Sequence, residues 1–449
     1  MKPQNMYIAI AMPLLLGACA GTPPLRSQTA SLQEGLAVAS AAARLSDGTD
    51  ADSAAFDRAV PLSLDRAVQR AFAHNPEVRA ALARLDAAQA ERVQAALLDN
   101  PMFSAMALRP EGGGRFQLEY GLMQSLYELL TRSRRIAVAD AEAQRREAEV
   151  LLDLLTLAQD SRAALVDAWF AEQIVQLERQ RLAVADESQR LALREVQQGI
   201  APASAALAQQ MAFVERAQAL RAAEAAQLAS RARLAGRLGQ SSAEGLLLPA
   251  ELPVPILAAL DAAEWRDWAI RSRPEQRMAA AQLEQARAQA ALETGVWRAT
   301  QPIMELGGMR DPKGMAMLGA KLQISLPLFD RGQARRALAA ARIVEAEQES
   351  EALRRRIALD VETALATLVL LRDGAAQAEQ RLRQQQQLEA LAQRLHDQGL
   401  GGRSALQAAT HERLMAVAER LQAERMYWSA LLELERVTGR RVFEQNLPR

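Results

Sequence analysis

The stretch HNPEVRAALARLDAAQAERVQAA, residues 74–96, decides the fold, because a variant of it returns about 200 residues later. That second copy is SRPEQRMAAAQLEQARAQAALE at 272–293. Two further markers repeat in the same order at nearly the same offset: VQQGIAPASAALAQQ (196–210) with HDQGLGGRSALQAAT (396–410), and RLAGRLG (233–239) with ELERVTG (433–439). Three markers in constant order indicate a tandem duplication of one structural unit.

Each copy predicts the same order of elements. A helix opens at Asn-Pro or Arg-Pro, where proline suits the first helical turn. Two short strands joined by a turn follow, then two long helices separated by Gly199 or Gly399 and ended by Gly239 or Gly439. The helices are expected at about 76–98, 132–198 and 204–238 in the first copy, and at about 274–297, 332–398 and 404–438 in the second.

The predicted strands have one apolar and one polar face. Phe116, Leu118, Tyr120 and Leu122 alternate with polar or small residues, and the same alternation runs over 316–326. Strict alternation predicts a strand with two unlike faces. A soluble sheet packed on the helices and strands of a membrane barrel both fit this pattern. Four strands cannot close a barrel in one chain, and open sheet edges are not tolerated in lipid. A barrel would therefore be shared among several copies.

The long helices carry coiled-coil patterning. Leu154, Ala168, Val175 and Leu182 recur at heptad positions, and an additional apolar face holds Leu151, Leu165 and Trp169. A helix of about 65 residues extends for about 100 Å. We expect neighbouring protomers to cover part of so long a rod.

The composition agrees with long, closely packed helices. Half of the residues are hydrophobic but only 4% are aromatic, and alanine is abundant. Charged residues make up 24% of the chain and balance to a net charge of zero, which gives no reason to expect nucleic acid as a partner. No run of 18 apolar residues is present, so no membrane-spanning helix is predicted.

The one cysteine of the chain, Cys19, follows a short apolar run in LLLGACAGT, residues 14–22. A positive start, an apolar stretch and small residues are the layout of a secretory signal peptide. Leu16-Gly17-Ala18-Cys19 also resembles the bacterial lipobox, which implies an acylated Cys19 as lipid anchor and, with Ala20 after it, outer-membrane sorting. The alternative is an ordinary cleaved signal without lipid.

The whole pattern resembles the TolC family of outer-membrane efflux ducts. The resemblance rests on the lipobox, the duplicated unit, QISLPLFDRGQARRALAAA in 323–341 and QGLGGRSALQAAT in 398–410. It implies a mainly α fold with a small antiparallel β part. A homotrimer would form a hollow coiled-coil α-barrel and a transmembrane β-barrel with four strands per chain. It also implies a passive duct that docks on a periplasmic adaptor and an inner-membrane pump of the resistance-nodulation-division type. The opening NPE motif is most similar to the heavy-metal branch.

The expected divisions follow from the repeat and the resemblance. They are a lipoprotein signal peptide at 1–18, a lipidated leader at 19–60, repeat 1 at 61–239, a proline-rich linker at 240–262, repeat 2 at 263–439 and a short tail at 440–449. The first copy reads MQSLYELLTRSRR where the second reads SLPLFDRGQARR, so its turn into the long helix is expected to differ.

The resemblance also implies functional positions. The periplasmic tip and adaptor contact would use Gly199, Gly399, Gly402, Arg403 and Leu406. Where family members often carry aspartates at the aperture, this chain has Ala405 and Ala408. The gate is then closed by helix packing alone, or other groups such as Gln209, Gln407, Asp397 or Glu412 take over. The barrel lumen would be lined by Gln117, Glu119, Lys321 and Gln323.

The sequence contains no pattern typical of an enzyme. His74, His396 and His411 have no metal-ligand spacing, no phosphate loop or dinucleotide motif occurs, and no nucleophile–base–acid set is apparent. We therefore expect no catalytic residues, no metal and no cofactor. The main alternative to a duct is a structural or adaptor coiled-coil lipoprotein without a pore, for which the two-faced strands have no use.

Overall fold

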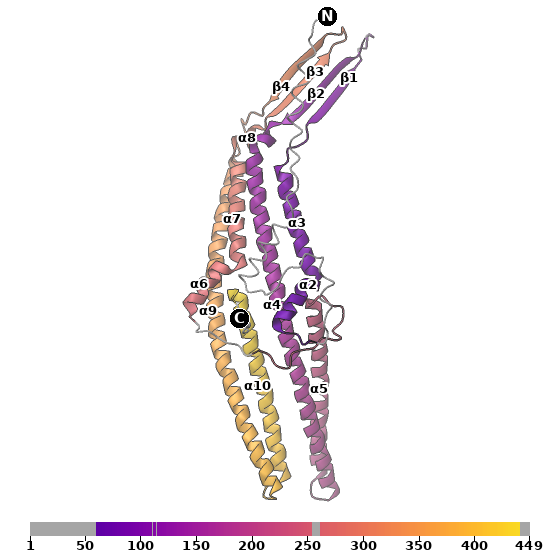
Figure 1. The fold of residues 1–449 in the computed structure, drawn as a ribbon, viewed down its shortest axis with the longest axis vertical. Helices are drawn as coiled ribbons and strands as arrows, with labels where there is room; N and C mark the ends of the chain where they lie inside the picture. The colour runs from indigo at the N-terminus through magenta and orange to yellow at the C-terminus, as the bar shows by residue number, and fades with distance from the viewer. Residues whose placement is uncertain (1–59, 110, 114, 254–260, 441–449) are drawn as a thin grey trace.

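The computed structural model describes residues 60–109, 111–113, 115–253 and 261–440. It is a long molecule with a sheet at one end and two helical hairpins at the other (Figure 1). The first hairpin pairs α4 (Leu126–Gln197) with α5 (Ala203–Arg237), and the second pairs α9 (Gln333–Asp397) with α10 (Arg403–Thr438). These four helices confirm the long helices expected of each copy. However, α4 begins at Leu126 rather than near 132, because no glycine or proline separates it from the preceding strand.

The shorter helices are more numerous than the sequence pattern indicated. Besides α3 (Pro76–Ala96) and α7 (Pro274–Glu293), the chain forms α2 (Leu64–His74), α6 (Ala262–Ser272) and α8 (Val296–Thr300). Ser63 caps α2 by accepting a hydrogen bond from the Arg66 amide, and Asp261 caps α6 in the same way. The expected single helix over 274–297 is wrong, since α7 ends at Glu293 and Gly295 precedes a separate turn of helix.

The sheet joins the two copies. Its strands are β1 (Met102–Leu108), β2 (Gln117–Ser125), β3 (Ile303–Arg310) and β4 (Ala316–Gln323), all antiparallel in the order β1-β2-β3-β4. The strand predicted to extend to Leu326 ends at Gln323 instead. Gln323 pairs with Ile303, the first residue of β3, so the residues after Gln323 have no strand beside them.

The two copies enter their long helices differently, as expected. β2 runs directly into α4 at Ser125, whereas nine residues (324–332) separate β4 from α9 and end at Gly332, which has a φ of 79°. The side chains of Leu326, Leu328 and Phe329 in this connection are exposed, Phe329 at 92%.

Helix α4 lies at the centre of the helical part. It packs against α5, α10, α7, α3 and α2, and its predicted seam residues Leu154, Ala168 and Val175 are buried. Leu151 and Leu165 on the additional face are buried as well. Helices of the same chain therefore cover both apolar faces of α4 along this stretch, and the expectation that neighbouring protomers cover part of the long rods stays a prediction for the other long helices. Helices α5 and α9 carry the most exposed of the large apolar side chains on the long helices, Leu228 and Leu370, whereas α4 exposes only Leu129, Leu130 and Leu193 near its two ends.

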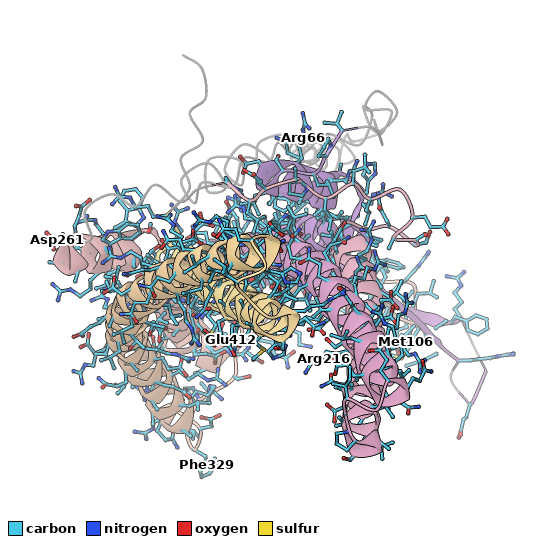
Figure 2. All side chains as sticks on the ribbon, turned by 90° about the horizontal axis from the view of Figure 1, so that it is seen from below. Arg66, Met106, Arg216, Asp261, Phe329 and Glu412 are labelled. Atoms are coloured by element: carbon cyan, nitrogen blue, oxygen red, sulfur yellow. The ribbon has the colours of Figure 1, made fainter. Side chains whose placement is uncertain are left out.

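The helices form a curved layer rather than a closed bundle. In the lower half the order is α9, α10, α4, α5, which leaves α9 and α5 as the two edges (Figure 1). Seen along the long axis, the layer curves around a hollow side (Figure 2). A buried ion pair ties the two copies together at mid-height. There Arg162 of α4 contacts Glu435 of α10 at 3.1 Å, with Asp65 of α2 at 3.5 Å from the same guanidinium.

Candidate functional site

One face of the sheet is apolar and exposed. The register places Leu118, Tyr120 and Leu122 of β2 on the same face as Phe103 of β1, and it adds residues from β3 and β4. The larger side chains of this face are between 39% and 73% exposed: Phe103, Leu118, Tyr120, Leu122, Met304, Leu306, Leu318 and Leu322. A contiguous apolar surface of this kind marks a contact with another protein or with lipid.

The opposite face, which we call the polar face, carries most of the polar side chains of the sheet among several methionines, and it gathers all four predicted lumen residues. Gln117, Glu119, Lys321 and Gln323 lie on this one face. Nε2 of Gln117 donates a hydrogen bond to Oε1 of Glu119 at 2.9 Å. Nζ of Lys321 donates to Oε2 of Glu305 at 3.3 Å.

Sequence reasoning missed Glu305. In β3, apolar residues alternate with polar or small ones, which is the pattern that predicted β2 and β4. Met304 and Leu306 alternate with Glu305 and Gly307. The two glycines in succession weaken that pattern. The register settles the placement, because Glu305 stands directly opposite Lys321.

The two glycine breaks at the far end of the molecule have the same geometry. Gly199 and Gly399 both have a φ of 72°, a conformation that glycine adopts without steric cost. A Cβ at either position meets no other atom within 4 Å, so both turns present an open surface. Gly402 is the N-cap residue of α10, and Arg403 begins that helix.

Arg403 joins the two hairpins at the tip. Its guanidinium pairs with the carboxylate of Glu187 on α4. Leu406, one turn further along α10, is half-buried. The tip of the second copy therefore contacts the first copy within one chain.

Two of the three aperture candidates line one cavity. This cavity has a volume of about 550 Å³ between α4, α5 and α10, and both Gln209 and Gln407 lie on its wall. Nε2 of Gln407 is buried and has no hydrogen-bond partner in the part of the chain that the structure describes. Asp397 does not line this cavity and lies at the end of α9, where it accepts a hydrogen bond from Gln393 at 2.8 Å. Cys19 and the signal and leader segments lie outside the described residues.

The described part of the chain contains no group of three or more His, Cys, Asp or Glu side chains arranged to hold a metal ion. His396 contacts the carbonyl of Gly401 through Nδ1 at 3.3 Å, within its own turn. Among the described helices, none is both long and apolar enough to cross a membrane.

Comparisons with known proteins give a clear result for the fold. No family model and no curated protein sequence matches the chain. Solved structures do match it. A membrane protein from Pseudomonas aeruginosa is 18% identical with a TM-score of 0.69, over 84% of this chain and 93% of that one. The outer-membrane channel OprN is 21% identical with a TM-score of 0.68, over 88% and 95%. The outer membrane protein VceC from Vibrio cholerae is 16% identical with a TM-score of 0.66, over 85% and 97%.

At these identities the likeness shows the fold. The chain therefore has the architecture of these three structures over nearly their whole length, which confirms the mainly α fold with a small antiparallel sheet.

Proposed function

We propose that this protein is the outer-membrane channel of an efflux system, working as a passive homotrimeric duct of the TolC family. The observation that carries the proposal is the two-faced sheet at the end of the helical layer. It has an exposed apolar face for lipid and a polar face for water. The fold shared with solved outer-membrane channels supports the same assignment.

The sheet has two open edges. Within the described residues, β1 and β4 each pair with only one strand, so their outer backbone groups have no strand partner there. In lipid, each backbone N–H or C=O group without a hydrogen-bond partner costs several kcal/mol, because no water is present to replace the partner. Three copies that join β4 to the β1 of the next copy remove every edge and close a twelve-stranded barrel.

The helical layer supports the same trimer. Its edge helix α5 exposes Leu207, Met211, Val214 and Leu228, which share one face at coiled-coil spacing. The other edge helix, α9, exposes Leu370, Leu388, Leu391 and Leu395. Three curved layers joined edge to edge, α5 against α9, would bury both stripes and enclose a tube along the long axis.

Each end of this tube has a proposed partner and a proposed location. The open turns at Gly199 and Gly399 would meet a periplasmic adaptor protein, which links the duct to an inner-membrane pump of the resistance-nodulation-division type. The sheet would sit in the outer membrane of a Gram-negative bacterium, with Cys19 acylated as an additional anchor. Cargo selection belongs to the pump, with the heavy-metal branch as the proposed class.

The alternative is a coiled-coil tether without a pore. A tether has no need for a sheet whose exposed face is apolar, so the observation that supports the duct counts against it.

Paired substitutions on adjacent residues of β4 test the lipid-facing role. Leu318 is on the apolar face and Met317 on the polar face. An arginine in the middle of the lipid-facing side of a barrel costs about 2–4 kcal/mol, whereas lumen positions tolerate charge. Leu318→Arg should therefore remove the protein from the outer-membrane fraction, and Met317→Arg should insert normally. Equal insertion of both variants would contradict the barrel.

A deletion strain tests export. Its growth should be measured against divalent metals and hydrophobic drugs, with and without the wild-type gene on a plasmid. Metal sensitivity alone supports the heavy-metal branch. Drug sensitivity with unchanged metal tolerance makes the protein a multidrug duct, and unchanged growth on the whole panel counts against an efflux role.

A further inference from the structure

The polar face of the sheet carries an unusual set of methionines. Besides the residues already described, the register places five methionine side chains there: Met102, Met106, Met123, Met309 and Met317. The apolar face, by contrast, holds Leu, Ala, Phe and Tyr side chains and the single methionine Met304, with Gln124 and Arg310 as its polar members. Methionine on this sheet is therefore concentrated on the face where apolar packing has least use for it.

The methionines form rows across the strands. In one row Met106 stands opposite Glu119, Glu119 opposite Met309, and Met309 opposite Met317. Side chains directly opposite each other on neighbouring strands have their Cβ atoms about 4.5–5.5 Å apart. Three thioether sulfurs and one carboxylate thus come from four consecutive strands of one chain.

The next row along the sheet leaves space beside Met317 of β4, although the Glu305 carboxylate lies over Gly121 in the same row. This row consists of Ser104, Gly121, Gly307 and Gly319, which carry almost no side chain. A Cβ at Gly319 would meet no atom within 4 Å. The thioethers of Met309 and Met317 can therefore turn over the glycine row, since a methionine side chain has three flexible bonds.

A further row offers an internal comparison. Met102 stands opposite Met123, Met123 opposite Glu305, and Glu305 opposite Lys321. Here Nζ of Lys321 lies 3.3 Å from Oε2 of Glu305, so the acidic group is already paired with a cation. In the first row, the hydrogen bond that Glu119 accepts comes from the neutral amide of Gln117.

Thioether ligands are soft donors and select soft cations such as Cu(I) over Mg²⁺, Ca²⁺ or Mn²⁺. We infer that Glu119, Met309 and Met317, on three consecutive strands, form a binding site for a soft monovalent cation of the Cu(I) and Ag(I) class, with Met106 beside Glu119 at its margin. The carboxylate of Glu119 balances the charge of the ion, and Met309 and Met317, being direct cross-strand neighbours, supply the first two sulfurs. The site lies within one chain, so it does not depend on closure of the proposed pore.

Silver(I) is the probe, because it has no accessible redox change under these conditions. The full-length protein in detergent is dialysed against silver nitrate in chloride-free buffer, and bound metal is counted by mass spectrometry. Every variant carries Cys19→Ser, since a free thiol would bind silver by itself. Circular dichroism and the mass in detergent verify that each variant is folded.

Replacing Met309 and Met317 together by leucine keeps the volume but removes two sulfurs, and should weaken silver binding at least about tenfold. The matched double change Met102→Leu with Met123→Leu should weaken it less than about threefold, because that row already holds Lys321. Met304→Leu, on the opposite face of the same strand, should have no effect.

A further variant, Glu119→Gln, keeps every thioether and should also lower the affinity. Equal silver binding by the reference protein and the Met309/Met317 double variant overturns the site. Equal losses in the two double variants overturn it too, since they would indicate unspecific binding to exposed methionine. A failure here leaves the insertion and export tests of the duct unaffected.

Discussion

At the scale of single residues, the joint between the end of α5 and the start of α3 leaves no room for a side chain. Gly239 ends α5 with a φ of 72°, and Nδ2 of Asn75 donates a hydrogen bond to the carbonyl of Arg237 at 3.1 Å. A Cβ added at Gly239 would lie 2.6 Å from the backbone of His74 and Asn75. Both the conformation and the space therefore require glycine.

Gly239→Ala should destabilise the protein by about 1–3 kcal/mol or more, because strain in the left-handed region and a backbone clash act together. The matched change Gly236→Ala, three residues earlier in α5, meets no atom within 4 Å and should be neutral or stabilising by up to about 1 kcal/mol. Thermal unfolding followed by circular dichroism compares the two. A Gly239→Ala protein as stable as wild type would show that this joint adapts.

The buried pair between Arg162 and Glu435 is a second residue-scale constraint. Both side chains are less than 10% exposed, so removing one partner leaves a charge with little access to water. Glu435→Gln should lower the free energy of unfolding by about 3 kcal/mol. This is the lower end of the range for removing one partner of a buried ion pair, because Asp65 still lies beside Arg162.

The exposed pair of Arg436 and Glu433 is the control for this change. Glu433→Gln should cost less than about 1 kcal/mol, since water replaces the lost partner. Urea unfolding measures both variants. Equal losses of unfolding free energy in Glu435→Gln and Glu433→Gln would contradict the prediction that a buried ion pair is costlier to break than an exposed one.

At the scale of elements, helix α4 is stabilised in its upper half by a charged cluster on its own surface. Nη2 and Nε of Arg145 donate to Glu142 at 2.7 and 3.1 Å, and Nε of Arg146 donates at 3.0 Å. The hydrogen bond from Arg145 is the main cause that lowers the pKa of Glu142 below its usual value. Folding therefore favours the ionised carboxylate.

A lowered pKa contributes stability above the unfolded pKa, and this contribution is lost as the pH falls through the folded pKa. Glu142→Gln should lower the melting temperature at pH 7 by an amount equivalent to less than about 1 kcal/mol, because the pair is partly exposed. The difference from wild type should shrink as the pH falls below about 4.3, the usual pKa of glutamate. A difference that stays constant between pH 7 and pH 3 would rule out the ion cluster as its cause.

At the scale of the whole molecule, the curved layer leaves its two edge helices incomplete. Leu228 of α5 is 71% exposed and Leu370 of α9 is 73% exposed, whereas the central helix α4 is well covered. Edge-to-edge association of identical layers requires apolar side chains on both edges, and the most exposed large apolar side chains of the four long helices lie there.

Placing charge on one edge should therefore prevent assembly. Met211→Glu with Leu228→Glu should reduce the mass in detergent from that of a trimer to that of a monomer, since desolvating two carboxylates opposes the contact. Ala226→Glu, exposed on the other side of α5, should leave the trimer intact. A trimeric double variant would contradict the α5–α9 contact.

The sequence by itself determined the duplication, the four long helices and the two unlike faces of the strands, because these features follow from local periodicity and from glycine and proline. It also identified four residues as facing the same, polar side of the strands, and the register places them on one face: Gln117, Glu119, Lys321 and Gln323. Helices α2 and α6 escaped notice because each is only 11 residues long and its caps, Ser63 and Asp261, lie in segments without a repeat marker.

Only the tertiary structure decided how the two copies combine. The pairing of β2 with β3 brings Glu305 to Lys321 and aligns Met106, Glu119, Met309 and Met317, residues that lie up to about 210 positions apart in the sequence. The coverage of α4 by the shorter helices, and the exposure of α5 and α9 in its place, likewise depend on which helices become neighbours. Local periodicity fixes what faces an element has, but contacts between distant segments fix what each face meets.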